Sequence, residues 1–158
     1  MLIYALIPAR SDSKRIKNKN LLKLNNKNLI QISVEQALKT VEIDKVFVST
    51  DSKKYQKISL AAGALVPYLR SKKISRDYST DLECFQDFLY QLKKKEITIP
   101  DIIVHLRATY PIRETGLISK CIRKFLKLKN KADSLRTIFR LKENIQKMWL
   151  LDKKNMIY

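Results

Sequence analysis

The sequence predicts an α/β fold with a mostly parallel sheet that is covered by helices on both faces. Short apolar runs alternate along the chain with segments in which apolar residues recur at helical spacing. The expected order is β-α-β-α-β-α-β-α-β, and its helices are long enough to cross over between parallel strands. No internal repeat, low-complexity tract or linker interrupts this order, so residues 1–158 are expected to form a single domain.

The first half of the chain is expected to supply two buried strands and two helices. Apolar runs at 2–7 and 45–51 predict the strands, and the apolar spacing over 29–41 predicts a helix packed on the sheet. A second helix is expected from about 52 to 62, with Gly63 placed to end it.

In the second half, Thr80 and Glu83 form a capping-box pattern that predicts the start of a helix. Its inward stripe is expected to consist of Leu82, Phe85, Leu89 and Leu92. The other expected elements are a short or edge strand at 64–69, which contains Pro67, a central-type strand within 97–106, a helix from Thr115, and strands at 134–139 and 148–151.

Composition limits the function classes without choosing among them. The formal net charge is +18, but the lysines are scattered and do not alternate with aromatic residues, so a surface bias is favoured over nucleic-acid binding. No apolar run is long enough to span a membrane, and the N-terminus does not resemble a signal peptide. The two cysteines, Cys84 and Cys121, do not make a disulfide framework, which favours a reducing cytoplasm, and both are expected to be buried thiols on apolar helical faces.

Polar loops follow three of the expected strands. The loop 10–20 is strongly cationic, and the loops 49–51 and 107–113 add hydroxyls, further cations and one carboxylate. Because ligands of parallel sheets bind outside the carboxyl ends of the strands, these loops are expected to meet at one edge. Their charges suit a nucleoside triphosphate and a second anionic substrate.

Several well-known sites are excluded. The chain contains only two glycines, Gly63 and Gly116, so it has neither the phosphate-loop motif of P-loop ATPases nor the glycine fingerprint of NAD enzymes. His105 is the one histidine, which leaves little for a zinc site or a catalytic triad, and it is expected to be a packed strand residue with a satisfied ring.

The loop residues resemble a known family. Ile7-Pro8-Ala9-Arg10, followed by Ser13-Lys14, Ile16 and Lys19-Asn20, resembles the opening motif of the sugar-acid cytidylyltransferases, in particular the acylneuraminate cytidylyltransferases (CMP-sialic acid synthetases). Further stretches resemble the family in order and spacing: Val48–Asp51, Val66–Arg70, Asp77 with Ser79-Thr80, Leu106–Arg113 and Lys147-Met148-Trp149.

The resemblance implies a Rossmann-like, three-layer α/β/α nucleotide-diphosphosugar transferase fold, usually as a homodimer, with Mg²⁺ as the metal. It also implies that CTP and a nonulosonic sugar acid react to a CMP-sugar and pyrophosphate. The residues matched to catalysis on the triphosphate are Arg10, Lys14 and Lys19. Those matched to nucleotide binding are Arg10, Ser13, Lys19, Asn20, Arg70, Ser79 and Thr80, and those matched to the sugar acid are Arg107, Thr109 and Arg113.

The chain departs from the family pattern at three points. Ser11, Asp12 and Arg15 stand where glycine is usual, which is expected to weaken CTP binding because glycine allows close approach of the backbone to phosphate. Arg107 stands where glutamine is common in sialic acid enzymes, which suggests a different nonulosonic acid. The family continues beyond Tyr158 with the aspartates that hold Mg²⁺ and most of the dimerisation region, so no metal ligand is predicted here.

Alternatives follow from these departures. One is a non-catalytic relative that binds a nucleotide or a partner chain through the same pocket, and another is a basic nucleic-acid-binding domain. Single residues also have structural alternatives: Thr80 as a helix cap alone, Asp51 as a cap for the helix from Ser52, and Arg113 as a residue that closes its loop onto the following helix.

Overall fold

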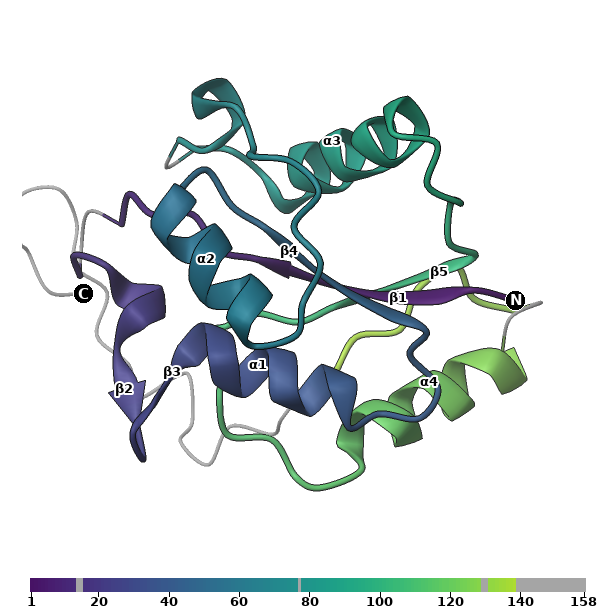
Figure 1. The fold of residues 1–158 in the computed structure, drawn as a ribbon. Helices are drawn as coiled ribbons and strands as arrows, with labels where there is room; N and C mark the ends of the chain where they lie inside the picture. Colours follow the sequence, from purple (N-terminus) through teal and green to yellow (C-terminus); the bar gives the residue numbers. More distant parts are fainter. Residues whose placement is uncertain (14–15, 77, 129–130, 139–158) are drawn as a thin grey trace, which may run out of the picture.

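The core of the protein is a parallel sheet built around one strand. The computed structural model describes residues 1–13, 16–76, 78–128 and 131–138. In the main sheet of this part, β1 (Ile3–Pro8) lies between β4 (Lys45–Ser49) and β5 (Ile102–His105), as Figure 1 shows. Both neighbours are parallel to β1, and Leu6 lies opposite Phe47 on one side and His105 on the other. The predicted parallel sheet is therefore confirmed.

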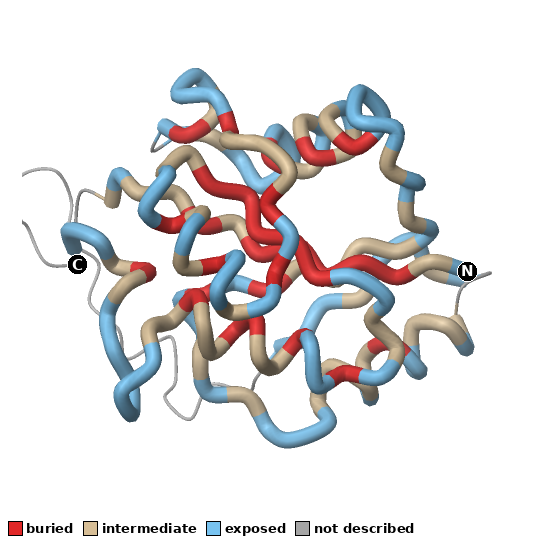
Figure 2. Tube along the Cα trace, in the orientation of Figure 1, coloured by how far each residue is buried: buried red, intermediate tan, exposed pale blue. Residues whose placement is uncertain are grey.

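Successive residues of β1 face opposite layers of helices. Ala5 and Ile7 pack against α1 (Leu29–Leu38), α2 (Lys53–Ala61) and α4 (Leu117–Leu128), whereas Tyr4 and Leu6 pack against α3 (Asp81–Lys94). Buried residues accordingly concentrate along the strands and on the inward helix faces (Figure 2). This arrangement is the three-layer α/β/α architecture expected from the sequence.

Side-chain caps fix where three of the helices begin. Asn28, Ser52 and Thr80 each accept a hydrogen bond from a backbone N–H in the first turn of α1, α2 and α3. Thr80 and Glu83 form the predicted capping box, and Asn28 forms a second one with Gln31. Gly63, with φ at +94°, follows the end of α2 as predicted.

Two predictions about the helices are confirmed only in part. The helix expected over 29–41 ends at Leu38, and Val41 is 92% exposed. In α3, Leu92 is buried and Phe85 and Leu89 are partly buried against the core as predicted, but Leu82 is exposed, and Cys84 and Phe88 are the other buried residues. Where apolar residues stand at adjacent positions, their spacing alone does not tell which of them faces the core.

The outer strands are shorter than predicted. The strand expected at 64–69 is reduced to one bridge between Leu65 and Phe47. In the described residues β5 pairs only with β1, so the central position expected for it is not found there. Residues 134–138 form no strand, and Phe139 and 148–151 lie outside the described residues. Cys84 is buried and Cys121 is half-buried.

A small hairpin was not predicted. The strands β2 (Lys23–Leu24) and β3 (Lys27–Asn28) pair antiparallel across Asn25 and Asn26, whose φ angles are +48° and +65°. Asparagine tolerates this left-handed conformation, so the Asn-Asn pair was a readable turn signal. Short 3₁₀ turns are formed by Lys19–Leu21 and Lys72–Ile74.

None of the helices in the described part of the chain combines the length and the apolar content that crossing a membrane requires.

Phe47 provides a test of the packing on the α3 side. Its ring lies 5.2 Å from that of Tyr4 and 5.1 Å from that of Phe88, between centroids. We expect Phe47→Ala to lower the free energy of unfolding by about 3–5 kcal/mol, since it removes buried contacts and leaves a cavity. Urea denaturation measures the change. The control is Leu60→Ala, at a 52% exposed position, whose effect is expected to stay within about 0.5 kcal/mol.

Glu42 provides a pH-dependent test of how α4 is held. Its carboxylate accepts hydrogen bonds from Ser119 Oγ at 2.7 Å and Arg123 Nε at 2.6 Å. The Ser119 hydrogen bond, against the opposing effect of burial and helped by Arg123, lowers the pKa of Glu42 below its ordinary value of 4.5. The carboxylate therefore contributes stability above pH 4.5, and this contribution is lost as the pH falls through the lowered pKa.

We expect the urea midpoint of wild type to exceed that of Glu42→Gln at neutral pH, and the difference to shrink in acid. An equal difference at all pH values would contradict a role for the ionised carboxylate.

Candidate functional site

The three polar loops predicted to meet do so at the carboxyl ends of β1, β4 and β5. The backbone N–H of Ala9 donates to Ser49 O at 2.9 Å, which continues the pairing of β1 and β4 into their loops. On the other side, the N–H of Leu106 donates to Leu6 O at 3.0 Å. Figure 1 shows these strand ends on the side of the molecule opposite the N-terminus.

Asp51 holds the beginning of the cationic loop. The N–H of Ser11 donates to Asp51 Oδ1 and its hydroxyl to Asp51 Oδ2, both at 2.8 Å. The alternative that Asp51 caps the helix from Ser52 is wrong, because Ser52 itself caps α2. Sequence reasoning missed this contact, since its two partners are 40 residues apart.

The far end of the loop is held by asparagines. Asn18 has a left-handed backbone with φ at +53°, and its side-chain oxygen accepts from Tyr55 Oη at 3.4 Å. Burial, with a smaller contribution from Asp51, raises the pKa of Tyr55, so its hydroxyl stays protonated as a donor. Asn20 is buried, and its Nδ2 donates to Arg10 O at 3.0 Å. The amide nitrogen of Asn20, a predicted nucleotide ligand, therefore holds the loop closed.

The predicted cations of the loop differ in what they contact. Arg10 Nη1 donates to Arg76 O at 2.5 Å, which links the loop to the segment before α3. Lys19 begins the 3₁₀ turn and is half-buried, and within the described residues its ammonium group makes no ion pair or hydrogen bond. Ser13 is half-buried, and Lys14 lies outside the described residues.

Arg70 is buried between β4 and α3. Its Nε donates to Ser75 Oγ at 3.2 Å and its Nη1 to Cys84 Sγ at 3.1 Å. Its own N–H donates to Thr50 O at 2.8 Å, just beyond the end of β4. Arg70 is 7% exposed, so its charge lies in the wall of the site and is not spread on the surface.

The residues before α3 have structural partners. Ser79 Oγ accepts from the N–H of Arg76 at 3.1 Å, and Thr80 Oγ1 accepts from the N–H of Glu83 at 3.2 Å. Thr80 is therefore a helix cap, while its contact with a nucleotide stays a prediction. Asp77 lies outside the described residues.

The loop 107–113 bridges the two helical layers. Arg107 forms an ion pair with Asp81 at the start of α3. Arg113 donates to Gln36 Oε1 at 2.5 Å and to Arg107 O at 2.9 Å, and Gln36 Nε2 donates to Pro111 O at 2.8 Å. Arg113 thus closes the loop onto α1 and not onto the following helix, which corrects the structural alternative drawn from the sequence. Burial lowers the pKa of Arg113, although an arginine remains charged at neutral pH. Thr109 is exposed.

His105 lies beneath this loop. Its ring meets Phe85 edge-on at 5.1 Å between centroids, as expected for a packed strand residue. The expectation of a satisfied ring is wrong for Nε2, which is buried without a hydrogen-bond partner among the residues that the structure describes. Burial is the largest cause that lowers the pKa of His105, Arg107 and Arg113 lower it further, and Asp81 opposes them. The ring is therefore neutral at neutral pH.

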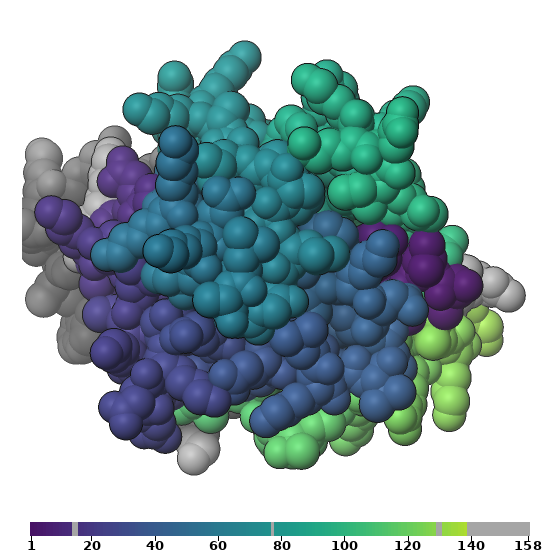
Figure 3. Space-filling model, in the orientation of Figure 1, coloured from purple at the N-terminus to yellow at the C-terminus, as the bar shows by residue number. Residues whose placement is uncertain are grey.

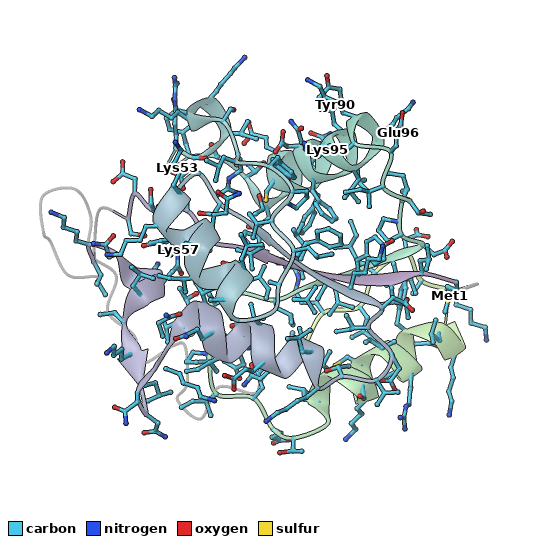
Figure 4. All side chains as sticks on the ribbon, viewed as in Figure 1. Met1, Lys53, Lys57, Tyr90, Lys95 and Glu96 are labelled. Atoms are coloured by element: carbon cyan, nitrogen blue, oxygen red, sulfur yellow. The ribbon has the colours of Figure 1, made fainter. Side chains whose placement is uncertain are left out.

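Other described lysines lie exposed on different helices. Lys53 and Lys57 are exposed on α2, and Lys95 is exposed at the end of α3 (Figure 4). The space-filling view shows long side chains projecting from several parts of this face, over segments from both halves of the chain (Figure 3). This distribution agrees with a general surface bias.

The described residues do not form a cage for a metal ion. No group of three or more His, Cys, Asp or Glu side chains suited to a metal occurs among the residues that the structure describes. At the sheet edge, Asp51 is bound to Ser11 and Asp81 to Arg107. Both carboxylates therefore already hold a contact within the protein.

Comparison with known proteins identifies close relatives. A family model described as cytidylyltransferase matches residues 4–153. Pseudaminic acid cytidylyltransferase of Campylobacter jejuni is 31% identical over 97% of this chain and 65% of its own length. CMP-N,N'-diacetyllegionaminic acid synthase of Legionella pneumophila is 33% identical over 77% of this chain and 52% of its own length. The chain thus spans about two thirds or less of the length of these curated relatives.

Solved structures share the fold. CMP:2-keto-3-deoxy-manno-octonic acid synthetase complexed with CTP is similar with a TM-score of 0.66 and 20% identity, over 80% of this chain and 48% of that one. A cytidylyltransferase from Leptospira borgpetersenii has a TM-score of 0.61 and 22% identity, over 80% of this chain and 50% of its own.

Gln36 offers a test of how the loop 107–113 is held. Because its side chain binds both Arg113 and Pro111 O, we expect Gln36→Ala to lower the free energy of unfolding by about 1–3 kcal/mol and to speed amide hydrogen exchange within 107–113. The matched control is Gln86→Ala on the exposed face of α3. Equal exchange rates in the two variants would show that Gln36 does not hold the loop.

Proposed function

This chain belongs to the cytidylyltransferase family, and on that premise we propose that it binds CTP at the sheet edge and transfers its cytidylyl group to a nonulosonic sugar acid. In this reaction the anomeric hydroxyl of the sugar attacks the α-phosphorus of CTP in line. A new P–O bond forms to the sugar, the bond from the α-phosphorus to the pyrophosphate oxygen breaks, and pyrophosphate leaves. The hydroxyl proton is released as the new bond forms.

The observation that supports this proposal most directly is the closed cationic loop after β1. Phosphoryl transfer depends on positioning and on neutralising the charge that spreads over the phosphate oxygens, more than on a protein nucleophile. The loop is fixed near both ends by Asp51 and Asn20, while the ammonium of Lys19 has no ion pair or hydrogen bond in the described part of the chain. Such a cation is available to a phosphate without the loss of an existing contact.

The proposed roles follow the family resemblance. Lys19 and Arg10, with Lys14, neutralise the triphosphate and are the proposed catalytic residues. Nucleotide binding is proposed for Arg10, Ser13, Lys19, Asn20, Arg70, Ser79 and Thr80, and sugar-acid binding for Arg107, Thr109 and Arg113. Of the two arginines proposed to bind the sugar acid, Arg107 is the more exposed. Its contact with Asp81 occupies a single nitrogen, Nη2. Its other N–H groups suit the carboxylate of a sugar acid.

The acceptor is proposed from the relatives. Two of them are named for pseudaminic acid and for diacetyllegionaminic acid, and a third, 35% identical over 69% of this chain, is an N-acylneuraminate cytidylyltransferase of Streptococcus agalactiae. All three acceptors are nine-carbon keto sugar acids with a carboxylate. Arg107, in place of the glutamine common in sialic acid enzymes, favours a nonulosonic acid other than N-acetylneuraminic acid.

Mg²⁺ is proposed to arrive with the nucleotide. It prefers phosphate oxygens and water, with few protein carboxylates, and it neutralises phosphate charge when bound. Since no group of three or more His, Cys, Asp or Glu side chains suited to a metal occurs among the described residues, no step is assigned here to a protein-held metal.

The second candidate function is nucleotide binding without turnover. It is favoured by one observation: the N–H of Ser11 is donated to Asp51, so this backbone donor is not directed at a phosphate. A homodimer remains a proposal from the family resemblance, and a cytoplasmic location remains a proposal from the two cysteines, which do not make a disulfide framework. A nucleic-acid-binding role would rest on the net charge alone.

The two candidates are separated by one experiment. The protein is incubated with CTP, Mg²⁺ and a panel of nonulosonic acids while pyrophosphate is followed, and thermal unfolding is measured with and without CTP. Pyrophosphate release supports the transferase, and stabilisation by CTP without release supports the binding protein. Neither release nor stabilisation would exclude both.

Lys19→Ala tests the triphosphate site. We expect it to weaken CTP binding about tenfold or more, because it removes a charge-assisted contact, while unfolding without ligand changes by less than about 0.5 kcal/mol. Titration calorimetry and urea denaturation measure the two quantities. Lys17→Ala, at an exposed position of the same loop, is the matched control and is expected to change CTP binding much less. A large loss of stability in Lys19→Ala would instead make Lys19 structural.

A further inference from the structure

We propose that Asp51 is a positioning residue that holds the beginning of the loop after β1, residues 10–13, in the conformation that binds the triphosphate. The inference rests on the proposed function, since it concerns how the CTP site is built. It is carried by the two hydrogen bonds between Asp51 and Ser11, which use both carboxylate oxygens and both polar groups that Ser11 can direct at them.

The carboxylate stands on a rigid base. Asp51 follows the buried residues Ser49 and Thr50 at the end of β4 and precedes Ser52, the cap of α2. Its backbone is therefore fixed by the sheet on one side and by the helix on the other. From this base Asp51 reaches across to the first turn of the loop, one residue beyond Arg10.

The contact continues a ladder between two strands. The N–H of Ala9 donates to Ser49 O, and two residues further on Ser11 donates to Asp51. Side-chain hydrogen bonds thus extend the parallel pairing of β1 and β4 past the point where the backbone pairing stops. Arg10 lies between these two attachment points, so its backbone is fixed from both sides.

Electrostatic attraction to a triphosphate does not explain why Asp51 stands at the sheet edge. A negative charge near the sheet edge repels a triphosphate, and among the described residues Asp51 forms no ion pair that would cancel it. Its partners are a backbone amide and a hydroxyl, both neutral. What Asp51 contributes is therefore geometry.

Ser11 gives this contact a form that glycine cannot. A glycine at position 11 would donate its N–H to Asp51 but would lack the hydroxyl that supplies the second bond. Serine in place of the usual glycine at position 11 therefore fixes the start of the loop more firmly. Phosphate is then bound by side chains such as Lys19 and not by the N–H of residue 11.

The test measures CTP affinity by titration calorimetry in three variants, well below their unfolding temperatures. Asp51→Ala removes both bonds and is expected to weaken CTP binding about tenfold. Asp51→Asn keeps the shape, since its amide can accept from the N–H of Ser11 and donate to the hydroxyl, and is expected to stay within about threefold of wild type. Ser11→Ala removes one bond and is expected to fall between them.

Two controls separate positioning from stability. Leu92→Val changes a residue on the buried face of α3 that makes no contact with Ser11 or Asp51. It is expected to lower the unfolding temperature and to leave CTP affinity unchanged. Asp12→Ala removes an exposed carboxylate from the same loop and is expected not to weaken binding.

Two outcomes overturn this inference alone, provided that wild type binds CTP. One is an Asp51→Ala variant with a lower unfolding temperature but wild-type affinity, which makes the contact merely structural. The other is an Asp51→Asn variant as weak as Asp51→Ala, which makes charge and not geometry decisive. A wild-type protein that does not bind CTP overturns the proposed function and this inference together.

Discussion

The whole architecture depends on the burial of β1 from both faces and its pairing along both edges. Residues Ile3 to Ile7 are at most 4% exposed, and the strand pairs in parallel with β4 and with β5. A strand in this position has to be apolar at every residue, because neither face meets water. Parallel pairing on both sides then brings the carboxyl ends of three strands to one edge, and the polar loops follow there by necessity.

At that edge the structure replaces backbone pairing with side-chain contacts. Asp51 holds Ser11, Asn20 holds the carbonyl of Arg10, and Gln36 holds both Arg113 and the carbonyl of Pro111. Each contact joins a loop to a rigid strand end, a neighbouring loop residue or a helix. Loops fixed in this way present their remaining donors in a set geometry, which reduces the ordering that a ligand would otherwise have to cause.

The cations at this edge have two kinds of environment. One kind is bound to groups of the protein itself, as in Arg70, Arg107 and Arg113. Part of the hydrogen-bonding capacity of these arginines therefore holds the protein's own segments together. Lys19 differs, since its ammonium makes no such contact in the described part of the chain. This contrast is physical support for treating Lys19 as a ligand-binding group and the arginines as groups that also hold the surrounding segments in place.

Local patterns in the sequence were enough for the fold class, the gathering of the three loops, the capping box of Thr80 and Glu83, and the helix end at Gly63. These features depend on apolar periodicity, on capping and on the direction of parallel strands, all of which act over a few residues or follow from chain order. Only the tertiary structure decided which side chains hold the site. Asp51 meets Ser11 across 40 residues and Arg113 meets Gln36 across 77, and such partners depend on how the layers pack. The same packing buried Cys84 and Phe88 of α3 and left Leu82 and Val41 exposed, because burial is set by the neighbouring element and not by the apolar residue alone.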